Sequence, residues 1–297
     1  MNDNPLLKKL GLSSDARAVI IHADDIGMCY ASVTAFKDLV GLGSISSAAT
    51  MVPCPWFPEM AAFCRTHSGV DVGVHLTLTS EWEGYRWGPI SSRDPGTGMM
   101  DEEGFFYRRE VGAWEHIDPV AAQIEMSAQL ARALAAGIDV THADIHMSTI
   151  LHPKLIRGYV QLAVQHRLPS IILRMSQSEA QAFGLDHETA VIGSQLVAQM
   201  EAQGWPLIDS MAMMPLDRSD DRVETAKQIL SSLQPGITHF IIHPSQDTAE
   251  LRAIAPDWRC RVADYEAFSD EGLNKWVKNS GLHVIGYKAI REVMRSV

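Results

Sequence analysis

The sequence predicts an α/β protein, an irregular (β/α) barrel of about seven parallel strands, in one domain that spans residues 1–297. Three observations support this prediction. Strand and helix patterns alternate along the whole chain. The run 18–21, Ala-Val-Ile-Ile, shows no polar alternation, as expected of a parallel strand that is covered on both faces. Acidic and imidazole side chains directly follow several predicted strands, where α/β folds place their reactive groups.

The individual elements follow from periodicity and from the residues that stop it. Apolar runs or strict alternation predict strands at 18–21, 46–52, 70–79, 138–146, 170–173, 207–211, 238–242 and 283–286. A period near 3.6 predicts helices at 31–42, 56–67, 119–136, 154–166, 176–204, 221–233, 269–279 and from residue 287 onward. Asp118 and Gly137 supply the cap and the stop of the helix 119–136. No linker or repeat interrupts the series, so we expect one domain.

The segment 80–111 breaks this alternation. It is rich in Gly, Pro and aromatic residues, and a loop of this length in a compact chain is usually functional. We expect a lid or a substrate-binding loop. Its aromatic residues suit the faces of sugars, and packing of the loop onto the body explains them equally well. These residues are Trp82, Tyr85, Trp87, Phe105, Phe106 and Tyr107.

Composition narrows the class of protein. The formal charge is −11, whereas nucleic acid or an anionic membrane surface requires a basic face, so neither is an expected partner. No apolar run approaches the roughly 18 residues of a membrane span, and the N-terminus lacks the pattern of a secretory signal. The four cysteines form no C-x-x-C pair. We therefore expect a cytoplasmic protein without a disulfide framework or a cysteine metal site.

Eight polar residues fall at or just beyond the predicted carboxyl ends of strands, and these ends converge on one face of a β/α barrel. They are Asp24, Asp25, His75, Asp144, His146, Arg174, Asp209 and His243. One carboxylate and two imidazoles form a common set of ligands for a divalent metal, with positions left open for water and substrate. We expect Asp25, His75 and His146 to be that set. Residue type alone does not distinguish zinc, magnesium, manganese, iron, cobalt or nickel.

The remaining residues match the other requirements of metal-assisted hydrolysis. Asp24 can take the proton of a metal-bound water, and His243 can protonate a leaving amine. Asp144 either orients a ligating imidazole or occupies a turn. Arg174 either orients a carboxylate or forms a structural ion pair. Of the eight residues, Asp209 has the weakest support for a role in the site. A single histidine at a strand end is more often a hydrogen-bonded structural group than a ligand, so only the joint pattern indicates a site.

Several motifs resemble those of the YdjC-like (ChbG/HpnK) carbohydrate deacetylases. They are Ile-His-Ala-Asp-Asp-Ile-Gly at 21–27, Gly-Val-His-Leu-Thr-Leu-Thr at 73–79, Thr-His-Ala-Asp-Ile-His at 141–146, His243-Pro244, and Gly-Leu-His-Val-Ile-Gly-Tyr at 281–287. Together they extend over nearly the whole chain. The ordered set is far more specific than any one motif.

This resemblance implies a barrel like that of polysaccharide deacetylases and hydrolysis of an N-acetyl group from an amino sugar. It implies one divalent ion, Mg²⁺ or Zn²⁺, on Asp25, His75 and His146. It also implies Asp24 as the base and His243 as the acid. A homodimer in the cytoplasm is typical of the family and is an expectation here.

Four positions depart from the family pattern. His22 stands where an asparagine is usual, and His239 stands where a glutamate is common. Ser148 and Ile150 replace further histidines. These replacements leave two alternatives open: a sugar-binding protein without catalysis, and a metal hydrolase of another bond such as a phosphoester. The few Lys and Arg residues near the expected site count against a phosphoester, because phosphate usually requires such residues as clamps.

Overall fold

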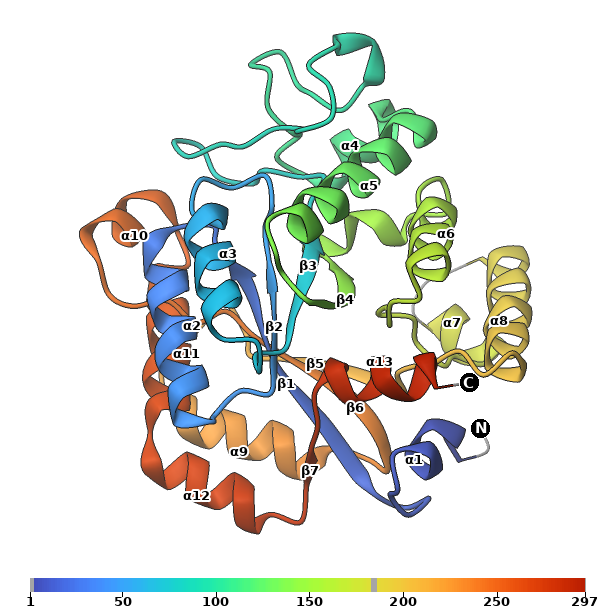
Figure 1. The fold of residues 1–297 in the computed structure, drawn as a ribbon, viewed down its shortest axis with the longest axis vertical. Coiled ribbons are helices and arrows are strands. Elements are labelled where there is room, and N and C mark those ends of the chain that lie inside the picture. The colour runs from blue at the N-terminus through green and yellow to red at the C-terminus, as the bar shows by residue number, and fades with distance from the viewer. Residues whose placement is uncertain (1–2, 183–185, 297) are drawn as a thin grey trace.

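The computed structural model describes residues 3–182 and 186–296, with a parallel sheet at the centre and helices around it (Figure 1). All strand pairs in this described part are parallel. The strands are β1 (Arg17–Ile26), β2 (Ser47–Thr50), β3 (Val72–Leu76), β4 (Val140–Ile145), β5 (Ser210–Met213), β6 (Gly236–Ile242) and β7 (His283–Val284). They follow the order β4-β3-β2-β1-β6-β5, and β7 pairs with the start of β1. The predicted parallel α/β fold is confirmed.

The helices cover this sheet. They are α1 (Pro5–Lys9), α2 (Tyr30–Leu42), α3 (Phe57–Thr66), α4 (Glu110–His116), α5 (Pro119–Ala135), α6 (Ile156–His166), α7 (Gln177–Ala182), α8 (His187–Ala202), α9 (Arg222–Ser232), α10 (Ala249–Ile254), α11 (Trp258–Ser269), α12 (Glu271–Asn279) and α13 (Tyr287–Arg295), with 3-10 turns η1 (Pro95–Thr97) and η2 (His146–Leu151). The predicted helix 176–204 corresponds to α7 and α8, and residues 183–185 between them lie outside the description. The helices α10 and α11 lie in a stretch for which the sequence predicted no element.

The barrel is closed only in part. β4 and β5 form the two edges of the regular sheet, and two isolated parallel bridges, Ala143 with Ser170 and Leu173 with Ile208, cross the gap between them. The segment that makes these bridges was predicted as the strand 170–173. It forms no ladder in the described chain, because the Ile172 N–H bonds back to Ser170 O at 2.9 Å and is not free for a neighbouring strand.

The residues of β1 divide between two environments. Val19, Ile21 and Ala23 pack in the large apolar core that also contains residues of α2. Ala18 and Ile20 belong to a second apolar cluster with residues of α1, β6 and α13. Because side chains alternate along a strand, His22 and Asp24 lie on the same face of β1 as this second cluster. That face is apolar at the amino end and polar toward the carboxyl end, where the candidate site lies.

The segment 80–111 packs onto the body of the protein. The side chains of Trp82, Trp87 and Phe106 are buried in the large core. The Trp87 indole N–H donates to Thr79 O at 2.7 Å, and the Tyr85 hydroxyl donates to Met28 O at 2.5 Å. Tyr85 and Tyr107 are partly buried against the same core, so packing accounts for five of the six aromatic residues of this loop. In Figure 1 the loop extends beyond the carboxyl ends of β2 and β3.

Candidate active site

The carboxyl end of β1 carries two adjacent aspartates, and the second has an unusual backbone conformation. Asp25 has a φ of 61°, in the left-handed region that aspartate tolerates better than most residues. Gly27 follows with a φ of 91°, and a Cβ there would approach the Thr50 hydroxyl to 3.0 Å. The turn thus requires glycine for both space and conformation. It buries the Asp25 side chain beside the ends of β3 and β4.

Asp25, His75 and His146 meet at one point. Asp25 Oδ1 lies 3.3 Å from His75 Nε2 and 3.2 Å from His146 Nδ1, and these two nitrogens are 3.3 Å apart. All three side chains are buried, and they are one of the groups in the described chain whose donor atoms could hold a metal ion. The predicted convergence of three distant segments is therefore present.

These distances fit a bound ion. Bonds of about 2.1 Å that meet at 90–110° place their donor atoms about 3.0–3.4 Å apart, which matches all three distances. Asp25 Oδ1 is buried and has no hydrogen-bond partner among the described residues, although it faces both imidazoles. One carboxylate oxygen and two imidazole nitrogens form a donor set for a divalent transition metal. The residues present therefore fit the expected ion.

Each donor is held by a second polar group. Asp144 Oδ1 lies 2.7 Å from His75 Nδ1, and Glu81 Oε2 lies 3.0 Å from His146 Nε2. The Arg261 guanidinium donates to Asp25 Oδ2 at 2.7 Å. Carboxylates on the outer nitrogens of ligating imidazoles fix the ring orientation and raise the basicity of the donor. Asp144 was a candidate from the sequence, whereas Glu81 and Arg261 were not, because a loop carboxylate and a helical arginine carry no local signal.

The electrostatics of the metal-free triad favour protons where the ion would bind. Burial lowers the pKa of His146, but Glu81 and Asp25 outweigh it and raise this pKa to about 9. Burial also opposes the charged form of His75, yet Asp144 and Asp24 hold its pKa well above the usual value. For Asp25, burial raises the pKa, and Arg261 with the two imidazoles brings it well below the ordinary range. These contacts favour the charged, doubly protonated form of both imidazoles, so an ion that binds here competes with protons.

Comparison with known proteins identifies the family of this chain. A sequence profile described as YdjC-like protein matches residues 18–279, which is most of the chain and includes every residue of the triad. The chain belongs to the YdjC-like family. Its curated relatives include a carbohydrate deacetylase of Thermus thermophilus, 28% identical over 97% of this chain and 99% of the relative. A carbohydrate deacetylase of Thermoanaerobacter pseudethanolicus is 22% identical over 92% of this chain and 99% of its own.

The fold of this YdjC-like protein is also found in a solved structure. A crystal structure from Enterococcus faecalis, named for cellobiose-phosphate cleavage, superposes with a TM-score of 0.74. The alignment covers 93% of this chain and 99% of the other, at 20% sequence identity. At that identity the likeness concerns the fold alone. It supports the arrangement of strands that brings the triad together.

Asp24 and His243 lie beside the triad of this YdjC-like protein. Asp24 Oδ2 is 4.0 Å from His75 Nε2, and Asp24 Oδ1 contacts His22 Nδ1 at 2.6 Å. Burial raises the pKa of Asp24, but His75, His22 and His243 together lower it below the ordinary carboxylate value. The backbone N–H of His243 donates to Asp264 Oδ2 at 2.9 Å, and its Nδ1 is buried without a partner in the described part of the chain.

Arg174 and Asp209 lie elsewhere. The β5 strand begins at Ser210, one residue after Asp209, so this carboxylate stands at the amino end of the strand and not at the predicted carboxyl end. Asp209 Oδ1 accepts from Arg174 at 2.8 Å, and its Oδ2 accepts from the Ile237 N–H at 2.7 Å. Arg174 also donates to Glu201. Of the two interpretations of Arg174, the contacts match the structural ion pair.

The replacements after His146 are accounted for by local structure. Ser148 has a φ of 56° in η2 and an exposed side chain. Ile150 is buried in the large apolar core. Neither residue belongs to a cluster of potential metal donors in the residues that the structure describes. The altered positions therefore leave the triad intact.

Proposed function

We propose that this protein is a metal-dependent hydrolase that removes the N-acetyl group from an amino sugar or oligosaccharide. The observation that carries the proposal is the triad of Asp25, His75 and His146, whose donor atoms stand 3.2–3.3 Å apart around an unpartnered carboxylate oxygen. The names of the two long relatives, both carbohydrate deacetylases, support the reaction and the substrate class.

In this proposal the triad holds one divalent ion, which would polarise the acetyl carbonyl and lower the pKa of a bound water. Two imidazole donors favour zinc over magnesium, because magnesium prefers an all-oxygen shell. Asp144 and Glu81 keep the outer nitrogens of the two imidazoles hydrogen-bonded, and Arg261 holds the second oxygen of Asp25. These contacts orient the donors before any ion binds.

Asp24 and His243 supply the proton transfers. Asp24 is the general base: its lowered pKa keeps it ionised at neutral pH, and it takes a proton from the attacking water. His243 gives a proton to the amide nitrogen as the C–N bond breaks, because an amide anion is a poor leaving group. A C–O bond forms, and the products are acetate and the free amino sugar. We treat Arg174 and Asp209 as a structural pair outside this chemistry.

We further propose a single catalytic domain in which the segment 80–111 borders the substrate. No helix in the described part of the chain has the length and apolarity needed to cross a membrane. The four cysteines are buried and unpaired, which is compatible with a reducing compartment such as the cytoplasm. A homodimer that binds neither nucleic acid nor membrane completes the proposal, and sedimentation of the purified chain tests its oligomeric state.

Acetate release tests the reaction. The purified protein is stripped with a chelator, resupplied with Zn²⁺ or Mg²⁺, and assayed on N-acetylglucosamine, its β-1,4 dimer and other N-acetylated sugars beside phosphate esters. We expect activity that disappears with the metal and returns with it. We expect Asp24→Asn to abolish activity and Glu83→Gln, at an exposed carboxylate two residues after Glu81, to leave it unchanged. Activity that survives complete metal removal contradicts the proposal, and saturable glycan binding without turnover supports a non-catalytic protein instead.

A further inference from the structure

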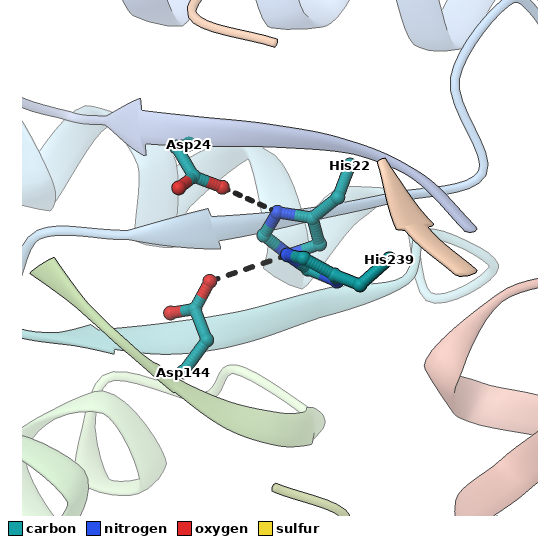
Figure 2. Close-up of side chains that lie close together, drawn as sticks. All are labelled: His22, Asp24, Asp144 and His239. Carbon is teal, nitrogen blue, oxygen red and sulfur yellow. Dashed lines mark hydrogen bonds and ion pairs between the residues drawn. The ribbon is translucent and has the colours of Figure 1, made fainter. Parts of the chain in front are cut away.

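A second buried polar cluster lies next to the triad, deeper among the strands. Figure 2 shows His22 between Asp24 and Asp144, with His239 beside it. All four side chains are buried, and their donor atoms are close enough to be considered as a second metal site. Asp144 Oδ2 and His239 Nε2 have no hydrogen-bond partner in the described chain. The question is whether this cluster holds an ion or protons.

The distances favour protons. His22 Nδ1 lies 2.6 Å from Asp24 Oδ1, and His22 Nε2 lies 2.8 Å from His142 Nε2. Both distances are hydrogen-bond lengths and fall below the separation of about 3.0–3.4 Å between donors around an ion. The donor atoms of Asp25, His75 and His146 have this separation, whereas the atoms around His22 lie closer together. Because both nitrogens of His22 are engaged in hydrogen bonds, His22 offers no lone pair to a metal.

His22 belongs to a series of hydrogen bonds that runs through His142 and Thr141 and ends at Asp71. The direction of each bond in this series can be worked out from the Asp71 end. This carboxylate accepts from the Lys288 N–H at 2.6 Å and from the Thr141 hydroxyl at 2.5 Å. A hydroxyl has one hydrogen, so the Thr141 oxygen must accept from His142 Nδ1, 2.9 Å away. His142 Nε2 then carries no hydrogen and accepts from His22 Nε2. The other nitrogen of His22 faces the carboxylate of Asp24.

We propose that His22 carries a proton on both ring nitrogens and acts as a positioning residue for Asp24. One proton bonds His22 to His142, and the other holds Asp24 Oδ1. Asp24 Oδ2 is left facing the triad, 4.0 Å from His75 Nε2. This inference rests on the proposed function, in which Asp24 takes a proton from water.

The surroundings stabilise one positive charge at this place. Asp24 lies on one side of His22, and Asp144 Oδ2 lies 3.6 Å from His22 Nε2 on the other. Burial, with the charge of neighbouring imidazoles, holds the pKa of His142 well below its usual value, and the same causes lower the pKa of His239. These two rings are therefore neutral. His22 is the one imidazole of the three that sits between two carboxylates.

The packing around this series of hydrogen bonds holds the His142 ring in place. Tyr287 stacks on His142 with ring centroids 4.0 Å apart and bonds His239 Nδ1 at 3.0 Å. On the side of β3, a Cβ at Gly73 would come within 2.6 Å of three atoms of the His142 ring. Gly73 is thus the residue that leaves room for this imidazole. His142 cannot move away from His22 without disturbing one of these neighbours.

Nitrogen-15 NMR of the histidine side chains tests the protonation state directly. The wild-type protein is labelled at histidine, and the His22 signals are assigned by their loss in His22→Asn. We expect both His22 nitrogens to show attached protons at pH 7, with and without bound zinc. A singly protonated His22 overturns the proposal, because the extra proton then resides at the Asp71 end of the chain. This readout needs no catalytic activity, so it remains valid if the proposed function fails.

Two replacements at position 22 separate positioning from packing. Asparagine keeps one N–H that can hold Asp24, whereas phenylalanine keeps the ring but donates nothing. If His22 positions the base, kcat falls about 10-fold in His22→Asn and about 100-fold or more in His22→Phe, with KM within about twofold. A role in packing alone predicts the reverse order. Tyr287→Phe is the matched control. It keeps the ring that stacks on His142 and removes a hydroxyl that takes no part in the hydrogen bonds between Asp71 and Asp24, so it should retain wild-type kcat.

Metal analysis completes the test. We expect one equivalent of zinc in the wild-type protein and one in His22→Asn. Two equivalents in the wild type, with one lost in the variant, mean that the cluster is a second ion site and overturn the proposal. Absence of acetate release by the wild type contradicts the proposed function and leaves the NMR result to be judged by itself.

Discussion

Glu81 offers a quantitative test of the ion centre because its carboxylate acts on both the metal-bound and the metal-free state. Its Oε2 is 3.0 Å from His146 Nε2, while Nδ1 of the same ring faces Asp25 Oδ1. An ion on Nδ1 makes Nε2 an N–H donor to Glu81. Glu81→Gln keeps the shape and removes the charge. Loss of such an outer carboxylate typically weakens metal binding by about 10- to 100-fold.

The same variant changes the competition with protons. Glu81 is the largest of the influences that raise the pKa of His146 to about 9, so at pH 7 the wild-type ion must displace a proton, at a cost on the order of 100-fold in affinity. In Glu81→Gln this pKa falls toward its ordinary value near 6.5, and most of that cost disappears. At pH 7 the two effects therefore oppose each other. Near pH 9 only the loss of basicity remains.

We therefore expect the affinity of Glu81→Gln for zinc to be close to wild type at pH 6.5 and about 10- to 100-fold weaker at pH 8.5. Titration against a chromophoric chelator at several pH values measures both proteins. Glu83→Gln is the matched control, since this carboxylate belongs to the same loop and is almost fully exposed. A constant ratio at every pH, or equal affinities at pH 8.5, refutes the assigned role of Glu81.

Three further predictions follow from other features of the structure. Gly73→Ala should destabilise the protein by about 1–3 kcal/mol in a denaturant titration, because its Cβ would overlap the His142 ring, and unchanged stability would show that the ring can move. Calorimetry in two buffers should show that zinc binding at pH 7 releases about two protons, one from His75 and one from His146, and that zinc affinity rises from pH 6 toward pH 9. Zinc binding without proton release would contradict the raised pKa values of these two residues. Burial raises the pKa of the Cys64 thiol to about 12, so a thiol reagent at pH 8 should label the native protein slowly and the denatured protein rapidly. Rapid labelling of the native protein would show that the reagent reaches the cysteines in the folded state. All four cysteines are buried, namely Cys29, Cys54, Cys64 and Cys260.

The triad could be predicted from the sequence because its signal is local. A buried strand followed at once by carboxylates is visible in the run that ends at Asp25, and strict alternation places His75 at the end of its strand. Parallel topology then brings these ends together without knowledge of any contact. Glu81 and Arg261 could not be found in this way. Their roles depend on where a loop and a helix dock, which no short pattern encodes.

The errors in the prediction have the same origin. The segment 207–211 looked like a strand that delivers Asp209 to the site, but pairing with β6 starts the strand at Ser210 and leaves Asp209 at the opposite end. A shift of three residues is within the uncertainty of strand boundaries, yet it decides which end of the barrel a carboxylate reaches. The segment 170–173 has strand composition, but its internal hydrogen bond prevents a ladder.

The charge balance of the triad explains why its geometry suits a divalent ion before one is bound. Without an ion, Asp25, Asp144 and Glu81 favour the charged form of the His75 and His146 imidazoles, in which each ring carries one extra proton. A divalent ion that displaces both protons leaves the charge of the buried pocket unchanged. The carboxylates therefore face the same total positive charge in both states, and no large electrostatic penalty drives them apart when the ion leaves. A monovalent ion that displaced the same two protons would lower the charge of this buried pocket by one, so the charge balance favours a divalent ion.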